Sequence, residues 1–403
     1  MVRPERRKKS DLVAVVLLVV GVLVAGTVIW WRGDARATTS QTAPAGVVAP
    51  APPTSVPPSL AEVWRAPSGA TTSPVVVGPT VVTAHGGEVV GHDPVTGDVR
   101  WRYARDLELC TVGSAWERAL AVYRKSRNCS EVTALDGVTG ERAAQRNGDS
   151  ELGTRLLTDG VHVTTTGGEL VEVWRSDLVR TMQYGEVPAI VNPNKQPRPQ
   201  CSYGSFAVAS NRIGVLERCP EDPTDRLTVL RPNPKESDQP EQIWTTLTAG
   251  RNARIVAMSG ELVAVALPDP ARLTVLDNGG RQIAEYPLSL PAGELAGDPP
   301  GRVVATTAGT SAIYWFTGSR TIALSPTDLR PLWTVENTLG PGTILAGRLM
   351  LPVSGGLAVH DAASGARLGV LPVDRAGYTG PVSVASLGPV LLEQRGDTLV
   401  ALR

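Results

Sequence analysis

The pattern of hydrophobic positions divides the chain into three parts. The first part contains an uninterrupted apolar run from Leu12 to Trp31, which has 20 residues and no charge. A helix of this length crosses roughly 30 Å, which matches the hydrocarbon core of a bilayer. We therefore predict a transmembrane helix over residues 12–31. No later segment of the sequence is long and apolar enough to be a second one.

The residues before this run set its expected orientation. Residues 1–11 carry five basic and two acidic side chains, and basic residues resist translocation across a membrane. We expect a cytoplasmic basic tail, an uncleaved signal anchor and an extracytoplasmic remainder held at the cell membrane. A cleaved signal peptide is the alternative, because Ala35-Arg36-Ala37 resembles a cleavage site, although an apolar run of this length is long for such a peptide.

The second part, residues 32–59, is rich in Ala, Pro and Thr and shows no hydrophobic periodicity. Its prolines lack a backbone donor, which favours an extended, partly polyproline II conformation. We interpret it as a tether that holds a globular domain away from the membrane. Disorder without a specific role is equally compatible with this composition.

The third part, residues 60–403, alternates short apolar runs with turn residues. Its clearest unit, Pro74 to Tyr103, contains four such runs separated by glycine-rich turns, which predicts four antiparallel strands. Weaker units follow, and the turn after the third run serves as a landmark that recurs near residues 93, 136, 174, 231, 277, 325, 361 and 403. The mean step is about 44 residues, a spacing typical of β-propeller blades. We predict an all-β propeller of about eight four-stranded blades. Seven blades are the alternative, because the third and fourth copies are weak.

One turn motif recurs in this region, and its strongest copy is Asp93-x-x-Thr96-Gly97-x-x-x-Trp101. The aspartate can accept hydrogen bonds from amides of its own turn, and the glycine supplies a positive φ. The tryptophan can pack between neighbouring sheets. Weaker copies of the turn, and further tryptophans at the matching strand position, are assigned the same structural roles. They are Asp136, Thr139, Gly140, Asp361, Ser364, Gly365, Trp64, Trp244 and Trp333.

The two ends of the third part predict closure of a ring. The chain ends in Thr398–Arg403, which matches the third strand of a blade that has no fourth. Residues Leu60–Arg65 resemble the fourth-strand pattern around Trp101. We therefore predict that the N-terminal strand completes the last blade, which would also cover otherwise open sheet edges.

The repeat Ala/Gly-x-Asp-x-x-Thr-Gly-x-x-x-Trp resembles the tryptophan-docking motif of the PQQ-like, quinoprotein-type propeller repeat family. The resemblance covers roughly residues 60–403. This family contains PQQ-dependent dehydrogenases and also non-enzymatic propellers, such as the lipoprotein subunit of the outer-membrane barrel assembly machinery, so the fold alone does not decide the function. The resemblance to the dehydrogenases implies a catalytic Asp, a Glu and an Asn that hold calcium, and commonly two adjacent cysteines. This chain has no adjacent cysteines, and we expect a non-enzymatic member without a cofactor.

The four cysteines occupy similar places in two repeats. Cys110 and Cys129 are 19 residues apart, and Cys201 and Cys219 are 18 apart. This placement predicts the disulfides Cys110–Cys129 and Cys201–Cys219 among three possible connectivities, and it fits an oxidising compartment. A metal site is not expected, because no tight Cys-x-x-Cys pair is present.

The charge balance and the positions of the histidines exclude two further kinds of binding site. The chain has 39 basic and 39 acidic residues, whereas a nucleic-acid binder needs a basic surface; no nucleic-acid partner is expected. His92 and His360 occupy equivalent repeat positions, and we interpret them as structural residues beside a turn rather than as ligands. The long polar loops Glu186–Gln200 and Arg231–Gln242 are the candidate sites of specificity, since loops on a rigid scaffold commonly bind partners.

These observations favour one function over two others. The leading hypothesis is a single-pass, membrane-anchored propeller that acts as a protein–protein interaction scaffold for envelope or secreted proteins. The alternatives are an extracytoplasmic ligand-binding or sensor propeller and a PQQ-dependent dehydrogenase. We expect no catalytic, cofactor-binding or metal-binding residues.

Overall fold

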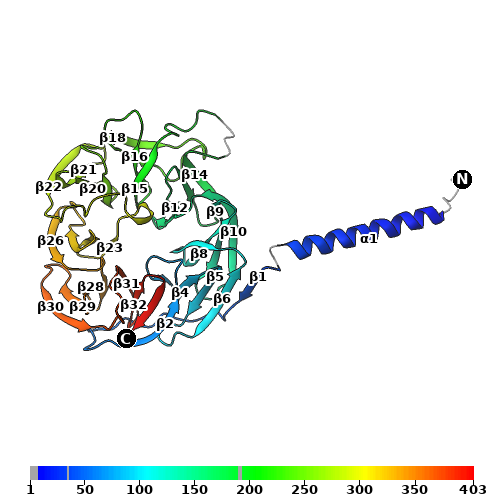
Figure 1. Cartoon of the computed structure of the whole chain (residues 1–403), viewed down its shortest axis with the longest axis horizontal. Helices are drawn as coiled ribbons and strands as arrows, with labels where there is room; N and C mark the ends of the chain where they lie inside the picture. The colour runs from blue at the N-terminus through cyan, green and yellow to red at the C-terminus, as the bar shows by residue number, and fades with distance from the viewer. Residues whose placement is uncertain (1–7, 34–35, 189–192) are drawn as a thin grey trace.

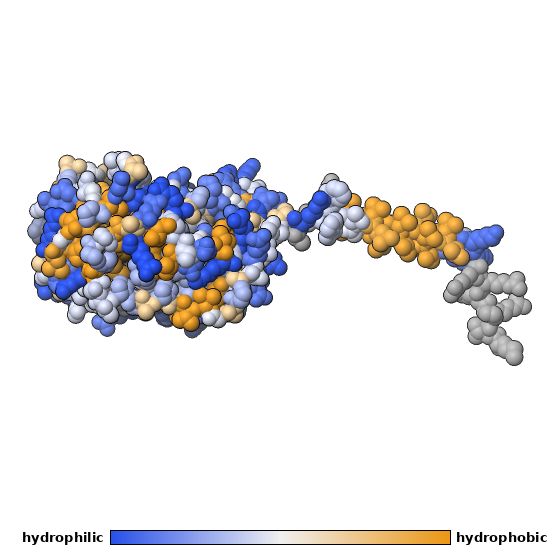
Figure 2. All heavy atoms as spheres, turned by 90° about the horizontal axis from the view of Figure 1, so that it is seen from below, coloured by the Kyte–Doolittle hydropathy of each residue, from blue (hydrophilic) through white to orange (hydrophobic). Residues whose placement is uncertain are grey.

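The computed structural model of the chain describes residues 8–33, 36–188 and 193–403. One helix, α1 (Lys9–Arg32), precedes a ring of eight sheets (Figure 1). The helix is long and apolar enough to cross a membrane, a property that an N-terminal signal sequence shares. Apolar side chains cover the face of the helix seen in Figure 2, and residues 12–31 are all exposed and carry no charge. Residues 1–7 of the predicted basic tail, and Ala35 of the possible cleavage site, lie outside the described residues.

The predicted propeller of eight blades is confirmed. Each blade is an antiparallel sheet whose strands follow one another from the centre of the ring to its rim, and we name them A to D in that order. Blade 1 has β3 (Val75–Val77), β4 (Thr80–His85), β5 (Glu88–His92) and β6 (Val99–Arg105). Blade 2 has β7 (Leu109–Ala115), β8 (Arg118–Lys125), β9 (Asn128–Asp136) and β10 (Arg142–Ser150). Blade 3 has β11 (Leu156–Thr158), β12 (Val163–Thr165), β13 (Leu170–Trp174) and β14 (Arg180–Gly185). Blade 4 has β15 (Ser202–Ala209), β16 (Arg212–Arg218), β17 (Arg226–Leu230) and β18 (Gln242–Leu247).

The second half of the ring repeats this plan. Blade 5 has β19 (Arg254–Met258), β20 (Val263–Pro268), β21 (Ala271–Leu276) and β22 (Gln282–Pro287). Blade 6 follows a short 3-10 helix η1 (Pro300–Arg302) and has β23 (Thr306–Ala308), β24 (Ile313–Phe316), β25 (Arg320–Leu324) and β26 (Pro331–Glu336). Blade 7 has β27 (Thr343–Leu345), β28 (Arg348–Val353), β29 (Gly356–Asp361) and β30 (Arg367–Pro372). Blade 8 has β31 (Val382–Leu387), β32 (Val390–Arg395), β33 (Thr398–Leu402) and, from the N-terminal side, β2 (Glu62–Pro67).

Blade 8 closes the ring as predicted. Strand β2 pairs antiparallel with β33, with Trp64 opposite Ala401 and Pro67 opposite Thr398. Ala61 and Arg403 also exchange two backbone hydrogen bonds of 2.9 Å. The last blade therefore contains strands from both ends of the domain, and neither end leaves an unpaired edge inside the ring.

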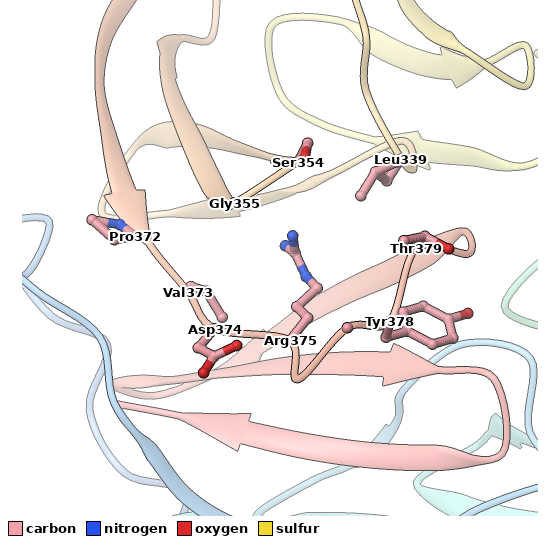
Figure 3. A pocket seen from close by; sticks show the side chains of 10 residues that line it. Leu339, Ser354, Gly355, Pro372, Val373, Asp374, Arg375, Tyr378 and Thr379 are labelled. Carbon is pink, nitrogen blue, oxygen red and sulfur yellow. The ribbon is translucent and has the colours of Figure 1, made fainter.

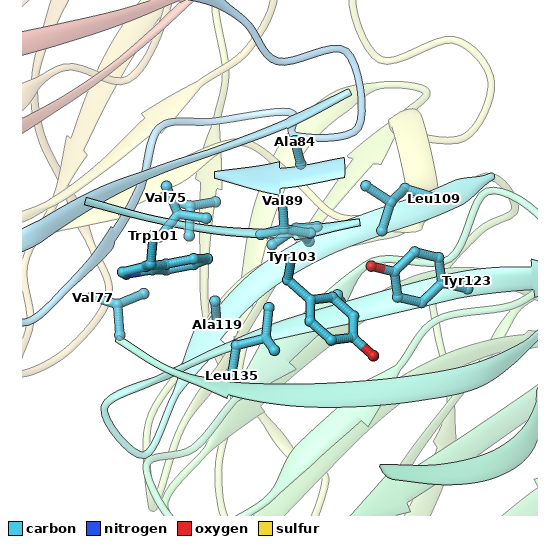
Figure 4. Close-up of a cluster of buried hydrophobic side chains, with 13 residues drawn as sticks. Val75, Val77, Ala84, Val89, Trp101, Tyr103, Leu109, Ala119, Tyr123 and Leu135 are labelled. Atoms are coloured by element: carbon cyan, nitrogen blue, oxygen red, sulfur yellow. The ribbon is translucent and has the colours of Figure 1, made fainter. Parts of the chain in front are cut away.

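The hydrophobic core lies between neighbouring blades. At the junction of blades 1 and 2, Trp101 and Tyr103 from β6 pack beside Val89 and against Tyr123 and Leu135 of the next sheet (Figure 4). Inner strands have a blade on each side, and β4 and β32 are accordingly buried over almost their whole length, polar residues included. The outer strands show the alternating burial of a sheet with one solvated face, as in β22.

The segment predicted to be a free tether is partly structured. Strand β1 (Thr38–Gln41) adds a fifth strand to the rim of blade 1 by pairing with β6. Farther along, the Ala43 amide donates to the Thr139 carbonyl at 2.9 Å, and Pro50 lies against Gly388. The sequence did not reveal this docking, because a strand of Thr-Thr-Ser-Gln has no hydrophobic pattern.

Candidate interaction surfaces

The predicted motif turns sit where each C strand passes into its D strand. In blade 1, the Asp93 carboxylate accepts hydrogen bonds from the amides of Val95 at 2.8 Å and Thr96 at 3.0 Å, and Gly97 has φ of 78°. Burial raises the pKa of Asp93, but these amides and the Arg100 guanidinium outweigh it, so the pKa lies below its ordinary value. The other two turns are built in the same way, from Asp136, Thr139, Gly140, Asp361, Ser364 and Gly365.

Each of the four predicted tryptophans packs on the turn glycine of the following blade. A Cβ atom added to Gly140 would come within 2.5 Å of the Trp101 ring, and the Trp101 indole donates to the Gly137 carbonyl at 3.2 Å. The matching partners of Gly97, Gly280 and Gly365 are Trp64, Trp244 and Trp333. These contacts join blades 8 to 1, 1 to 2, 4 to 5 and 6 to 7, so the motif is a device for joining sheets.

The two equivalent histidines stand behind these turns in blades 1 and 7. The Nδ1 atom of His92 lies 3.0 Å from the Gly97 carbonyl oxygen, and that of His360 lies 2.8 Å from the Gly365 carbonyl oxygen. His92 also lies 2.9 Å from the Thr83 hydroxyl and stacks on the Trp64 ring, with centroids 5.3 Å apart. Both side chains are buried against their own turns, which fits structural roles.

His92 makes the ring-closing junction sensitive to acid. Burial lowers its pKa below the ordinary value of 6.5, with the positive charge of Arg102 acting in the same direction and the Gly97 carbonyl against it. The unfolded chain therefore binds this proton at a higher pH than the folded chain does. Stability is fully present above about pH 6.5 and falls as the pH drops toward the lower folded-state value.

We therefore expect the free energy of unfolding to fall when the pH is lowered from about 7.5 to about 5, and to fall more in the wild type than in the His92→Gln variant. Urea unfolding at the two pH values, followed by fluorescence, measures the difference. His85→Gln, at an exposed position in the same blade, is the control and should behave as the wild type. Identical pH dependence in the wild type and His92→Gln would show that His92 does not sense acid.

Both predicted disulfides are present, Cys110–Cys129 in blade 2 and Cys201–Cys219 in blade 4. Glu221 lies near the second pair. Cysteine sulfurs that are joined to each other do not supply the thiolates that a metal ion requires. This cluster is therefore a covalent link rather than a metal centre.

The propeller has two faces with different loops. One face carries the loops from A to B and from C to D, including the motif turns, and we call it the AB face. The other carries the loops from D to the next A and from B to C, and we call it the DA face. The AB face of blades 2, 1 and 8 is overlain by residues 42–61, which run from Thr139 to Gly388.

The centre of the DA face is crossed by the chain itself. Residues 288–305 leave blade 5 and enter blade 6, yet they reach blades 3 and 4 on the way (Figure 1). The Gly301 carbonyl accepts a hydrogen bond from Thr166 at 2.9 Å, and the Arg302 guanidinium donates to the Tyr203 carbonyl at 2.8 Å. Asp298 binds Arg218 of blade 4. We call residues 288–305 the axial loop.

The A strands, which surround the central axis, carry few side chains that could bind a metal ion or catalyse a reaction. In the part of the chain that the structure describes, none of the eight A strands contains Asp, Glu, Asn or His. Their partly exposed positions are small or apolar, such as Ser114, Ala207, Thr306 and Ser383. The carboxylate and amide ligands that calcium prefers are therefore missing from these strands.

Buried carboxylates instead tie the loops of the DA face to the sheets. Glu393 of β32 is completely buried and accepts hydrogen bonds from Arg375, in the loop between blades 7 and 8, and from Arg395. Glu217 of β16 similarly binds Arg198, which lies in the loop before blade 4. These pairs could not be predicted from the sequence, because a glutamate inside a strand pattern does not reveal its partner.

A cavity of about 560 Å³ opens on the DA face beside Arg375 (Figure 3). Its wall combines the apolar side chains of Leu339 and Val373 with the ring of Tyr378 and the polar Thr379. The Arg375 guanidinium projects among them but is already engaged by Glu393 and by two backbone carbonyls. Asp374, which is exposed, also lines the cavity. The cavity therefore presents carbon, hydroxyl and carboxylate groups.

The two long loops singled out in the sequence lie together at blade 3. The loop at residues 231–241 runs along the outer edge of β14, where the Gln183 amide donates to the Ser237 carbonyl at 3.3 Å. Lys195 and Gln196 of the other loop contact Gln239 and the Asp238 carbonyl. Residues 189–192 lie outside the described residues. Much of the loop at residues 231–241 thus covers the edge of β14.

Comparisons with known proteins agree with the class that this geometry defines, an eight-bladed β-propeller. No protein-family model matches the sequence, and no curated protein matches it. Among solved structures, the chain is similar to BamB from Moraxella catarrhalis, with 14% identity over 85% of this chain and 99% of that chain and a TM-score of 0.51.

Two further solved structures show the same likeness. Sqt1 from Saccharomyces cerevisiae has 12% identity, with 85% of this chain and 97% of that chain covered and a TM-score of 0.52. The dihydro-heme d1 dehydrogenase NirN, in complex with DHE, has 12% identity, covers 84% of this chain and 78% of its own, and has a TM-score of 0.53. At these identities the likeness shows the fold alone, and membership of the PQQ-like family stays a prediction.

Proposed function

We propose that this protein is a single-pass, membrane-anchored propeller that acts outside the cytoplasm as a scaffold for envelope or secreted proteins. In this proposal α1 is the anchor, and the propeller binds protein partners without catalysis and without a cofactor. The two disulfides support an oxidising compartment. The lack of the adjacent cysteines that are common in the dehydrogenases of the resembling family supports the absence of catalysis.

The observation that carries the proposal is the path of the axial loop across the DA face. Gly301 and Arg302 of this loop are bound to blades 3 and 4, so protein backbone covers part of the face where a ligand would enter. The A strands also lack the acidic and amide side chains that catalysis or calcium binding would use. What remains for function is a rigid rim with loops and a shallow cavity, which suits protein contacts.

Crosslinking in native membranes, followed by capture of the full chain, tests this proposal. We expect a reproducible set of envelope proteins from the wild type and its loss in Thr379→Arg, which places a charge at the exposed edge of the DA-face cavity. Val161→Arg, at an exposed position on the AB face, is the matched control and should retain the partners. Absence of any reproducible partner, or equal loss in both variants, would contradict the proposal.

A ligand-binding or sensor role is the second candidate, and the cavity at Tyr378 favours it. Its volume of about 560 Å³ lies within the range of small-molecule sites. A ligand of the native state would raise the melting temperature in a saturable way, and Thr379→Arg would remove that effect while leaving the fold intact.

A PQQ-dependent dehydrogenase is tested by titration of the protein with PQQ and calcium. Uptake of PQQ together with reduction of a dye would overturn the proposal that the protein is not an enzyme.

A further inference from the structure

The tryptophan position of the repeat is occupied by glycine in blade 7. In the motif copy that begins at Asp361, Gly369 stands where blade 1 has Trp101. The strand registers agree, since each of the two residues pairs with the position two before the aspartate of its turn. A Cβ atom added to Gly369 would meet no atom of the described residues within 4 Å. The junction of blades 7 and 8 therefore lacks the indole that joins four other pairs of blades.

Blade 8 also lacks the turn on which such a tryptophan would pack. Its fourth strand, β2, comes from the N-terminal side of the domain, so β33 does not lead into it through a tight turn with a glycine. Ala61 and Arg403 bind each other through their backbones at this point instead. Both halves of the usual contact between tryptophan and glycine are thus missing at one junction.

A cavity of about 280 Å³ lies at this junction, and we call it the vacant slot. Its apolar wall is formed by Leu60, Val373 and Leu402. Val373 and Leu402 are 6% and 2% exposed. The exposed residues Ala61 and Glu62 also line the slot, so it is open to solvent.

Leu402 ties the vacant slot to the position of the missing indole. It is the last residue of β33, and the corresponding residue at the end of the C strand contacts or packs near the tryptophan at three other junctions. His92 stacks on Trp64, with ring centroids 5.3 Å apart. The two leucines at this position share a hydrophobic cluster with their tryptophans, as Figure 4 shows for the first pair; the pairs are Leu135 with Trp101 and Leu276 with Trp244.

The size and lining of the slot suit an aromatic ring. A cavity of about 150 Å³ that is lined by apolar side chains holds benzene, and the slot has about 280 Å³. Its mouth is polar, because Glu62 and Arg65 form an ion pair there and Asp374 is exposed beside them. The slot thus combines an apolar interior with a polar mouth, which suits an aromatic side chain that stands among polar neighbours.

We propose that the vacant slot is a docking site for an aromatic side chain, best a tryptophan, on an exposed polar segment of a partner protein. The partner supplies in trans the ring that Trp64, Trp101, Trp244 and Trp333 supply within the chain at the other junctions. The inference deepens the proposed scaffold function and rests on it for the statement that the ligand belongs to a protein.

Fluorine NMR of a labelled peptide tests the slot on the full chain in detergent. The probe is acetyl-Gly-Ser-Trp-Ser-Gly-amide with one fluorine atom on the indole. We expect its signal to broaden saturably with the wild type. The unlabelled peptide should displace the probe, and the same peptide with alanine in place of tryptophan should not. A signal that the wild type leaves unchanged would overturn the inference.

Gly369→Trp places an indole in the slot from within the chain. We expect it to weaken binding of the probe at least tenfold and to raise the melting temperature, because it restores the contact that other junctions have. Leu368→Trp, at a position that is 54% exposed on the opposite face of β30, is the matched control and should behave as the wild type. Equal binding by Gly369→Trp and the wild type would overturn the inference.

Leu60→Asp tests the slot without adding a large side chain. Leu60 is half-buried in the apolar wall, and a carboxylate there opposes entry of an aromatic ring. We expect at least tenfold weaker binding with the circular dichroism of the wild type. Thr379→Arg, in the other cavity of the DA face, should leave binding of the probe unchanged. If Thr379→Arg removes the binding and Leu60→Asp does not, the ring docks elsewhere and the inference is wrong.

Crosslinking in native membranes separates this inference from the proposed function. Loss of the partner proteins in Gly369→Trp, with their retention in Leu368→Trp, would support the slot as their docking site. If the wild type captures partners and Gly369→Trp captures the same set, the inference is overturned and the scaffold function stands. If the wild type captures no reproducible partner, the scaffold function fails, and the peptide still decides whether the slot binds an aromatic side chain.

Discussion

Replacing Glu393 by alanine is expected to destabilise the protein by about 3–5 kcal/mol, because it leaves buried positive charge without its partner. Glu393 is completely buried, and the side chains of Arg375 and Arg395 around it are 5% exposed. Its two oxygens receive hydrogen bonds of 2.7, 3.0 and 2.8 Å from these guanidinium groups. The substitution removes both acceptor oxygens and with them all three hydrogen bonds.

Urea unfolding in matched buffers measures this loss. Glu336→Ala is the control, because Glu336 also binds an arginine, Arg320, but is 67% exposed; a pair of that kind contributes about 0–1 kcal/mol. We expect the midpoint to fall strongly for Glu393→Ala and little for Glu336→Ala. Equal losses would mean that the burial of Glu393 does not increase its contribution to stability.

The pairing of Glu393 with its arginines is a kind of contact that could not be predicted from the sequence. A glutamate in the middle of β32 and an arginine in a loop 18 residues away carry no shared local pattern, and their pairing depends on how blade 8 meets the preceding loop. The same holds for the axial loop, whose contacts with Thr166 and Tyr203 join residues about a hundred or more positions apart. Such contacts follow from the closed ring and cannot be read from neighbouring residues.

The blades themselves could be predicted because their signals are local. The predicted C-strand landmarks near 93, 136, 174, 231, 277, 325, 361 and 403 all fall within one residue of the observed ends of the C strands. Each landmark marks a place where a buried strand must give way to a tight turn, which restricts the residue types. Even the weak copies at Trp174 and Leu230 keep this transition, and so the count of eight was correct.

For the N-terminal segment, amino-acid composition predicts the extended conformation but not where the segment is attached. Alanine, proline and threonine indicated an extended chain, and residues 42–61 do lack regular structure up to β2. However, extended chain is also what an open sheet edge binds, and Thr38–Gln41 occupy such an edge. Composition predicts conformation here but not attachment, since backbone pairing needs no particular side chain.

The contact between Trp101 and Gly140 yields the second large effect that we expect. Trp101 is 1% exposed and fills the space between blades 1 and 2. Trp101→Ala should therefore lower the free energy of unfolding by about 3–5 kcal/mol, through lost burial and the cavity left behind. Trp333→Ala, at the equivalent but partly exposed position, should cost clearly less. Urea unfolding of the two variants makes the comparison.

Gly140→Ala separates the packing of the ring from the conformation of the turn. Gly140 has φ of 71°, and its added Cβ would collide with the Trp101 ring. Gly347 has φ of 70° with open space around it, so Gly347→Ala costs only the backbone strain of about 1–2 kcal/mol. We expect Gly140→Ala to cost more than Gly347→Ala, and the excess to disappear when Trp101→Ala is also present, because the two side chains share one space. If the excess persists in the double variant, the tryptophan does not dock on this glycine, and the blades must be joined by other contacts.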